Sequence, residues 1–274
     1  MSFMEKLRQA WRRQNSLLCV GLDPDPAKLP EILSGDQTLF EFNRQIIDAT
    51  APWSCAFKPQ IAYYAAAGAE KQLEMTIRYI ADNYSNIPVI LDAKRGDIGA
   101  TAEMYAREAF DRYGADAVTV NPYMGGDTLQ PFLDRADRGV IVLCRTSNPG
   151  SGDIQGLEAD NESVALRVAK MAATQWNQNN NIGLVVGATY PDQLRMIRQL
   201  VGDTPMLIPG IGAQGGDLQK VLDAGLDQAG TGLVINASRS IIYAGNGSDF
   251  AEAAASEAQK LCEQINTNRS KYIP

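Results

Sequence analysis

The 274-residue sequence contains no histidine. This absence excludes Ser-His-Asp and Cys-His nucleophile systems, imidazole metal sites and acid/base catalysis by imidazole. Any chemistry that the chain performs must therefore use lysine, arginine, carboxylate, thiol, phenol or backbone groups.

Cysteine is also scarce. The four cysteines are far apart, and no two of them form a Cys-x-x-Cys pair; they are Cys19, Cys55, Cys144 and Cys262. Three of them lie in apolar runs that predict strands, where a free cysteine usually packs as a small hydrophobic residue. We therefore expect inert, reduced thiols and a cytoplasmic protein.

Long apolar stretches are absent, since no run approaches the ~20 residues that a membrane-spanning helix requires. The first residues, MSFMEKLRQAWRRQ, are charged and amphipathic and lack the apolar centre of a signal peptide. The sequence has 25 Lys and Arg against 32 Asp and Glu, a net charge of −7. This balance argues against nucleic acid and anionic membranes as partners.

Short apolar runs alternate with helical patterns along the whole chain. Eight runs with little polar alternation are typical of strands buried on both faces of a parallel sheet. They are residues 17–22, 53–58, 87–92, 117–121, 140–144, 183–186, 206–209 and 228–234. A helical pattern follows each run.

Eight strand-helix units in about 260 residues predict a single-domain (β/α)8 TIM barrel. An extra N-terminal helix, residues 1–16, precedes the repeat. A doubly wound open sheet is the alternative, although it usually has fewer strands at this length. Because no linker or low-complexity tract interrupts the chain, we expect residues 1–274 to form one domain.

Charged residues follow the first three predicted strands, at the end of a barrel where active sites are built. Asp23 follows the first strand, Lys58 ends the second, and Asp92, Lys94 and Asp97 follow one another at the third. Two residues apart on a strand, Asp92 and Lys94 face the same side. Flanking carboxylates favour the ammonium form of Lys94, which suits a proton donor rather than a nucleophile. A salt-bridge network at the rim of the barrel is the alternative.

Residues 210–215 match Gly-x-Gly-x-x-Gly, the dinucleotide-binding pattern. The match follows the seventh strand rather than the first, and Asp227 begins rather than ends the next strand. We therefore favour a phosphate site formed by backbone N–H groups and a helix N-terminus. Arg239, after the eighth strand, is suited to bind the same phosphate through two hydrogen bonds. The alternative is a glycine-rich turn beside a surface arginine.

The segment 145–153, after the fifth strand, is polar and interrupted by glycine and proline. A long loop at the catalytic face indicates a recognition segment or a lid.

Taken together, these residues resemble the orotidine 5′-phosphate decarboxylase family in its longer microbial form. Residues 92–101 match the family motif Asp-x-Lys-x-x-Asp-Ile-x-x-Thr in full. Supporting matches lie at 20–23, 57–59, 208–212 and 237–239, so the resemblance extends over residues 20 to 240.

The resemblance implies a homodimer that converts orotidine 5′-phosphate to uridine 5′-phosphate and CO2 without metal or cofactor. Lys94 would protonate C6 of the pyrimidine, and Asp92 would lie beside the leaving carboxylate. Asp97 and Thr101 would reach across the dimer interface to the ribose in the partner's site.

The resemblance also implies the substrate contacts. Asp23 and Lys58 would bind ribose hydroxyls. Ser147 would contact the pyrimidine edge, and Gln214 would link phosphate and base. The phosphate ligands would be Gly210, Gly212 and Arg239.

Three other functions are consistent with the same residues. A Mg²⁺-dependent sugar-phosphate lyase or synthase of similar fold shares the Asp-x-Lys-x-x-Asp motif but usually employs a histidine. A Schiff-base aldolase would use Lys94 as a free amine, which the neighbouring carboxylates oppose. A barrel that binds a ligand or another subunit without catalysis is the third.

Overall fold

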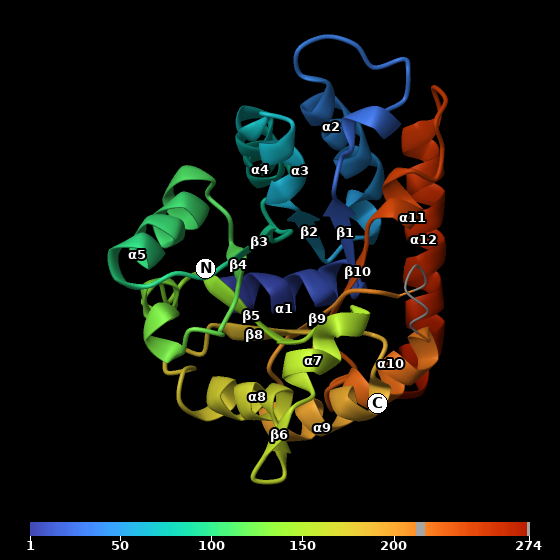
Figure 1. The fold of residues 1–274 in the computed structure, drawn as a ribbon. Helices are drawn as coiled ribbons and strands as arrows, with labels where there is room; N and C mark the ends of the chain where they lie inside the picture. The colour runs from blue at the N-terminus through green and yellow to red at the C-terminus, as the bar shows by residue number, and fades with distance from the viewer. Residues whose placement is uncertain (212–216, 273–274) are drawn as a thin grey trace.

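The structure is a computed structural model and describes residues 1–211 and 217–272. Among these residues, eight parallel strands form one sheet in the order β2-β1-β10-β9-β8-β5-β4-β3. Backbone bridges from Phe57 to Val89 and from Gln60 to Asp92 connect β2 to β3. The sheet therefore closes on itself, and helices surround it as an outer ring (Figure 1).

The elements follow the order that the sequence predicts. The barrel strands are β1 (Leu18–Leu22), β2 (Ala56–Pro59), β3 (Ile90–Arg95), β4 (Ala117–Val120), β5 (Gly139–Arg145), β8 (Ile182–Val186), β9 (Met206–Ile208) and β10 (Leu233–Ala237). The main helices that follow them are α2 (Thr38–Thr50), α4 (Glu70–Asn83), α5 (Gly99–Arg107), α6 (Gln130–Leu133), α8 (Val164–Thr174), α9 (Pro191–Val201), α10 (Leu218–Gly225) and α12 (Phe250–Arg269). The connections contain α3 (Ile61–Ala66), α7 (Gly152–Gln155), α11 (Arg239–Ile242) and a small hairpin of β6 (Glu158–Ala159) and β7 (Glu162–Ser163). The predicted (β/α)8 barrel is confirmed.

The N-terminal helix α1 (Phe3–Arg13) closes the amino end of the barrel, which confirms the helix predicted outside the repeat. The ring of Phe3 packs on Gly139 at the start of β5, where any larger residue would overlap it. The ammonium of Lys6 lies 2.8 Å from the carboxylate of Asp116, directly before β4. Because α1 covers the amino end, the carboxyl ends of the strands form the open face.

The eighth strand begins later than the sequence predicts, at Leu233 rather than at residue 228. The carboxylate of Asp227 accepts hydrogen bonds from the backbone N–H groups of Ala229 and Thr231, at 2.9 and 2.8 Å. These bonds fold residues 227–231 into a turn, a common use of an aspartate side chain. The prediction that Asp227 begins a strand was therefore wrong, because the side chain holds a turn instead.

Arg198 anchors the end of α9 to the turns that precede β9 and β10. Its guanidinium donates hydrogen bonds to the carbonyls of Gly225, Gly202, Thr204 and Gly232, at 2.6 to 2.8 Å. The side chain is buried, and so are Gly225 and Gly232, so the carbonyls of these two glycines have little access to water as an alternative donor.

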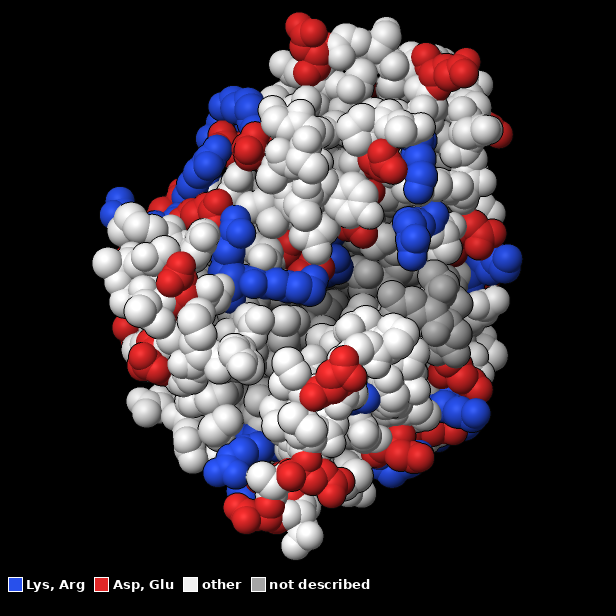
Figure 2. Space-filling view, in the orientation of Figure 1, with Lys and Arg blue, Asp and Glu red and all other residues white. Residues whose placement is uncertain are grey.

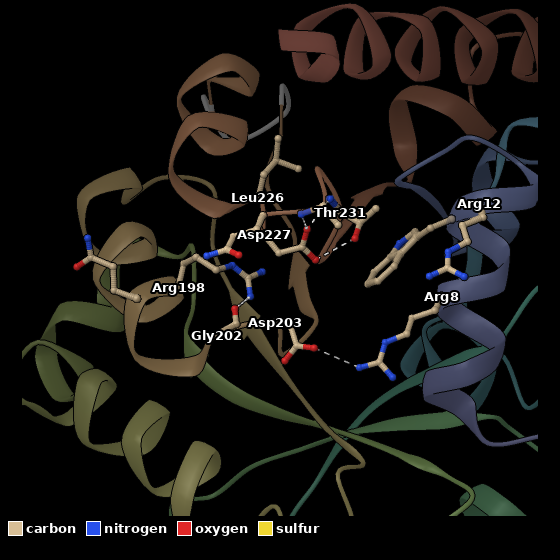
Figure 3. Close-up of a pocket in the computed structure, with 12 residues that line it drawn as sticks. Arg8, Arg12, Arg198, Gly202, Asp203, Leu226, Asp227 and Thr231 are labelled. Atoms are coloured by element: carbon tan, nitrogen blue, oxygen red, sulfur yellow. Dashed lines mark hydrogen bonds and ion pairs between the residues drawn. The ribbon is translucent and has the colours of Figure 1, made fainter. Parts of the chain in front are cut away.

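A cavity of about 730 Å³ lies beside Arg198 at the amino end of the barrel, with Arg8 and Arg12 of α1 on its other wall (Figure 3). Burial lowers the pKa of Arg198 to about 10, and the carboxylates of Asp227 and Asp203 oppose this only in part. The buried cation is therefore held by backbone dipoles. The cavity lies at the end of the barrel opposite to the one where such folds carry active sites.

Replacement of this anchor should destabilise the protein. We expect Arg198→Met to lower the free energy of unfolding by about 3 kcal/mol, because it leaves buried carbonyls without donors. Urea unfolding followed by circular dichroism measures the change. Arg195→Met, on the exposed side of the same helix, is the matched control and should change stability little. Equal stability of the two variants would contradict the role of Arg198.

Candidate functional site

A cavity of about 520 Å³ opens at the carboxyl ends of the strands. Figure 2 shows a hollow at the centre of this face, with basic and acidic side chains in its wall. Seven of the residues that the sequence proposes line this cavity: Asp23, Lys58, Asp92, Lys94, Ser147, Gly210 and Arg239. Residues up to 216 positions apart in the sequence thus meet in one place, as expected for the strand ends of a barrel.

An ion-pair array of three side chains forms the floor of the cavity. The Lys58 ammonium lies 2.9 Å from Oδ2 of Asp92, and the Lys94 ammonium lies 2.6 Å from Oδ1 of the same carboxylate. Lys58 and Asp92 are buried, whereas 46% of the Lys94 side chain is exposed to the cavity side of the array. One carboxylate therefore holds a buried ammonium and an accessible one.

The electrostatics of the array keep the two buried groups, Asp92 and Lys58, ionised. Burial alone would raise the pKa of Asp92, but Lys58 and Lys94 outweigh it and hold this pKa well below its usual range. Burial alone would lower the pKa of Lys58, but Asp92 and Asp23 raise it above its ordinary value. Each charge is thus stabilised by its partners rather than by water.

Lys94 reaches Asp92 through an irregular stretch of β3, not through the regular strand that the sequence predicts. Leu91 pairs with Val118 and Arg95 with Val120, so three residues of β3 lie opposite one residue of β4. Lys94 itself has a φ of +47°, in the left-handed region that side chains rarely adopt. The bulge redirects the lysine side chain toward the cavity, as bulges beside active sites often do.

The β1 exit loop places Asp23 at the cavity wall. The hydroxyl of Tyr243 accepts a hydrogen bond from the backbone N–H of Asp25 and donates one to the carbonyl of Asp23. Oδ1 of Asp23 is buried and has no hydrogen-bond partner among the described residues. An unsatisfied carboxylate oxygen of this kind is suited to a ligand hydroxyl.

The other end of the cavity carries the predicted phosphate ligands. Gly210 has a φ of +96°, which favours glycine, and Arg239 begins α11 directly after β10. Gly212 and Gln214 lie outside the described residues.

Asp97 and Thr101 do not line the cavity of their own chain. Oδ1 of Asp97 accepts a hydrogen bond from the neighbouring N–H of Ile98, and Thr101 lies exposed in the first turn of α5. The group that completes the Asp92–Lys94 array within the chain is therefore Lys58, not Asp97. The expectation that Asp97 flanks Lys94 in the same chain was wrong, because the loop after β3 carries its carboxylate away.

Arg145, which no sequence motif singles out, fixes the loop after β5. Its guanidinium lies over the ring of Tyr190 at 3.8 Å and donates hydrogen bonds to Gln193 and Ser151. The side chain of Gln155 accepts a hydrogen bond from the N–H of Thr146, beside Ser147. A charged residue at the end of an apolar strand was the only signal in the sequence.

The four cysteines are buried and free. Burial raises the pKa of the Cys19 and Cys144 thiols to about 12, so these groups stay protonated at neutral pH. The expectation of unreactive thiols is consistent with this environment.

Within residues 1–211 and 217–272, no helix is both long and apolar enough to cross a membrane. No cluster of three or more Cys, Asp or Glu side chains in these ranges could hold a metal ion.

Similarity to known proteins establishes the family. The model of the Orotidine 5′-phosphate decarboxylase / HUMPS family matches residues 16–254. The chain belongs to this family. Over 271 residues it is 58% identical to the orotidine 5′-phosphate decarboxylase of Ralstonia pickettii (strain 12J), which covers 98% of this chain and 100% of that protein.

Two solved structures show the same fold at substantial identity. The OMP decarboxylase of Leishmania donovani superposes with a TM-score of 0.85 at 42% identity, over 98% of this chain and 99% of that chain. The UMP synthase of the same organism gives a TM-score of 0.88 at 42% identity, over 98% of this chain and 57% of that longer chain. The fold and the family assignment therefore agree.

The buried ion pair is testable as a coupled unit. We expect Asp92→Asn to lower the free energy of unfolding by about 3 kcal/mol, because it leaves the Lys58 ammonium buried without a carboxylate. The double variant Lys58→Met/Asp92→Asn should lose less than the sum of the two single losses. Urea unfolding of all four proteins at pH 7 measures this coupling, and additive losses would contradict it.

The same pair predicts a pH dependence. The folded-state pKa of Asp92 is lowered, so its contribution is complete above the ordinary aspartate pKa of about 4 and is lost as the pH falls further. The stability difference between the wild type and Asp92→Asn should therefore shrink below about pH 4. A difference that grows in acid would contradict the assignment.

Proposed function

We propose that this protein decarboxylates orotidine 5′-phosphate to uridine 5′-phosphate and CO2, the reaction for which its relatives are named. The observation that carries the proposal is the Lys58–Asp92–Lys94 array at the floor of the carboxyl-end cavity. It presents an accessible ammonium beside a carboxylate that cannot easily take up the proton. Buried, free thiols fit a reducing compartment, and we infer a cytoplasmic location.

In the proposed reaction, the bond between C6 and the carboxyl carbon breaks, and its electron pair remains on C6. The Lys94 ammonium stabilises this developing charge and then delivers its proton to C6. The fixed positions of the charges mean that little reorganisation is needed as the reaction proceeds. Asp92 lies beside the substrate carboxylate and keeps the ammonium in place.

The remaining cavity residues bind the nucleotide. Arg239 and the N–H of Gly210 would hold the phosphate, and Ser147 would contact the pyrimidine edge. Asp23 would accept hydrogen bonds from ribose hydroxyls through its unpartnered oxygen. Lys58 donates one of its three N–H groups to Asp92, which leaves two for the ribose.

We infer that the active form is a homodimer, with Asp97 and Thr101 reaching the ribose in the partner's site. On the loop after β3, on α5 and on the loop after β4, large apolar side chains are exposed. They are Ile98, Met104, Tyr123 and Met124. Exposed apolar side chains of this size mark protein–protein interfaces where they gather.

The geometry disfavours the alternatives. A Schiff-base aldolase needs Lys94 as a free amine, whereas a carboxylate at 2.6 Å stabilises the ammonium. A salt-bridge network at the rim would lie exposed, whereas Lys58 and Asp92 are buried in the floor of the cavity. A metal-dependent lyase of this fold usually uses the histidine that the sequence lacks.

Lys94→Ala should abolish decarboxylation because it removes the proton donor and the stabilising charge. Loss of orotidine 5′-phosphate absorbance, followed with a chelator present, measures activity and metal independence together. Circular dichroism checks the fold, and Lys71→Ala, at a highly exposed lysine on α4, is the control. Substantial turnover by folded Lys94→Ala would refute the proton-donor role.

Mixed dimers test the shared site. Neither Lys94→Ala nor Asp97→Ala should be active alone, but a heterodimer contains one site with both wild-type residues. We therefore expect partial activity after the two variants are mixed and subunits exchange. Lack of activity in heterodimers isolated by two different affinity tags would count against a cross-subunit Asp97.

A further inference from the structure

We propose that Thr119, at the carboxyl end of β4, is a positioning residue that holds both Asp92 and Lys94 in their reactive geometry. The inference rests on the proposed role of Lys94 as proton donor. Thr119 lines the cavity, but only 1% of the residue is exposed, and its single hydroxyl contacts the bulge of β3.

The hydroxyl of Thr119 makes three hydrogen bonds to the bulge. Oγ1 accepts from the backbone N–H groups of Ala93 and Lys94, at 3.0 and 2.9 Å, and donates to Oδ1 of Asp92 at 2.9 Å. One donor and two acceptor positions are all that a hydroxyl offers. With its capacity used, this hydroxyl acts on the reaction through its neighbours rather than by binding substrate.

These bonds replace part of the sheet where β3 departs from regular pairing. Three residues of β3 lie opposite Thr119, so the strand cannot continue the backbone ladder there. Two consecutive N–H groups instead share one side-chain oxygen. Backbone pairing resumes at Asn121, whose N–H donates to the carbonyl of Arg95 at 2.7 Å.

The bond to the Lys94 N–H also stabilises an unfavourable backbone conformation. Lys94 has a φ of +47°, in the left-handed region that is unfavourable for a residue with a side chain. This conformation turns the Lys94 side chain back over Asp92, where its ammonium meets the same Oδ1 that Thr119 contacts. One hydroxyl thus fixes the backbone of the proton donor and the carboxylate that orients it.

Thr119→Val tests this role, since it removes the hydroxyl and keeps the shape of the side chain. We expect kcat to fall about ten- to a hundredfold, the size of effect produced by a displacement of ~1 Å at a reacting group. KM and the affinity for uridine 5′-phosphate should stay close to wild type, because the phosphate and ribose ligands are untouched. Thr119→Ser, which keeps the hydroxyl, should restore most of kcat.

Two additional variants make the outcome decisive. Thr50→Val removes a buried threonine hydroxyl from α2, away from the cavity, and should leave kcat unchanged. Thr119→Cys has nearly the size of serine but a weak acceptor, so it should lose kcat where serine retains it, even if Thr119→Val fails to fold.

The results distinguish a failure of the positioning role of Thr119 from a failure of the proposed function. If Lys94→Ala is inactive but Thr119→Val and Thr119→Cys retain wild-type kcat, the positioning role is refuted and the proposed function stands. If Lys94→Ala remains active, the proton-donor role on which this inference rests is refuted, whereas a wild-type protein without decarboxylase activity would refute the proposed function. A rise in KM alone in the Thr119 variants would also refute the inference, because it would show a binding role.

Discussion

The carboxylate of Asp92 is the constraint on which the site depends. Two lysines from different strands share its two oxygens, and the buried one, Lys58, could not remain charged in that place without it. The pairing requires β2 and β3 to be neighbours with matched ends. The bridge between Gln60 and Asp92, which helps to close the barrel, provides that register. The same contact between β2 and β3 therefore helps to close the barrel and brings Lys58 to Asp92.

Much of the fold follows from the sequence because buried parallel strands leave a strong signal. Apolar runs located all eight strands, and the helical patterns between them gave the repeat. The errors arise where a side chain overrides the local pattern. Asp227 folds the start of a predicted strand into a turn, and the Thr119 hydroxyl bonds to the bulge in β3 from a residue 27 positions after Asp92. The first effect depends on one side chain within the segment, and the second depends on a residue of another strand.

The sequence predicts which residues meet at the site but not how their side chains pair. The strand-end rule brought Asp23, Lys58, Asp92 and Lys94 to one face, because topology alone determines where strand ends meet. The sequence could not predict which of these side chains pair, because Lys58 and Asp92 are 34 residues apart and no spacing pattern marks their contact. The position of Asp97 depends on the path of a loop, and periodicity says nothing about such paths.

The absence of histidine and the form of the array have a common explanation. Histidine is the side chain whose ordinary pKa allows it to gain or lose a proton near neutral pH. In the reaction that we propose, the site presents a proton at carbon while a neighbouring carboxylate stays ionised, and neither step requires such a group. Here Lys58 keeps Asp92 charged from the buried side, and Asp92 in turn orients Lys94 on the open side. Ion pairing thus determines which groups are charged, and the β3 bulge opposite Thr119 determines where the Lys94 ammonium points.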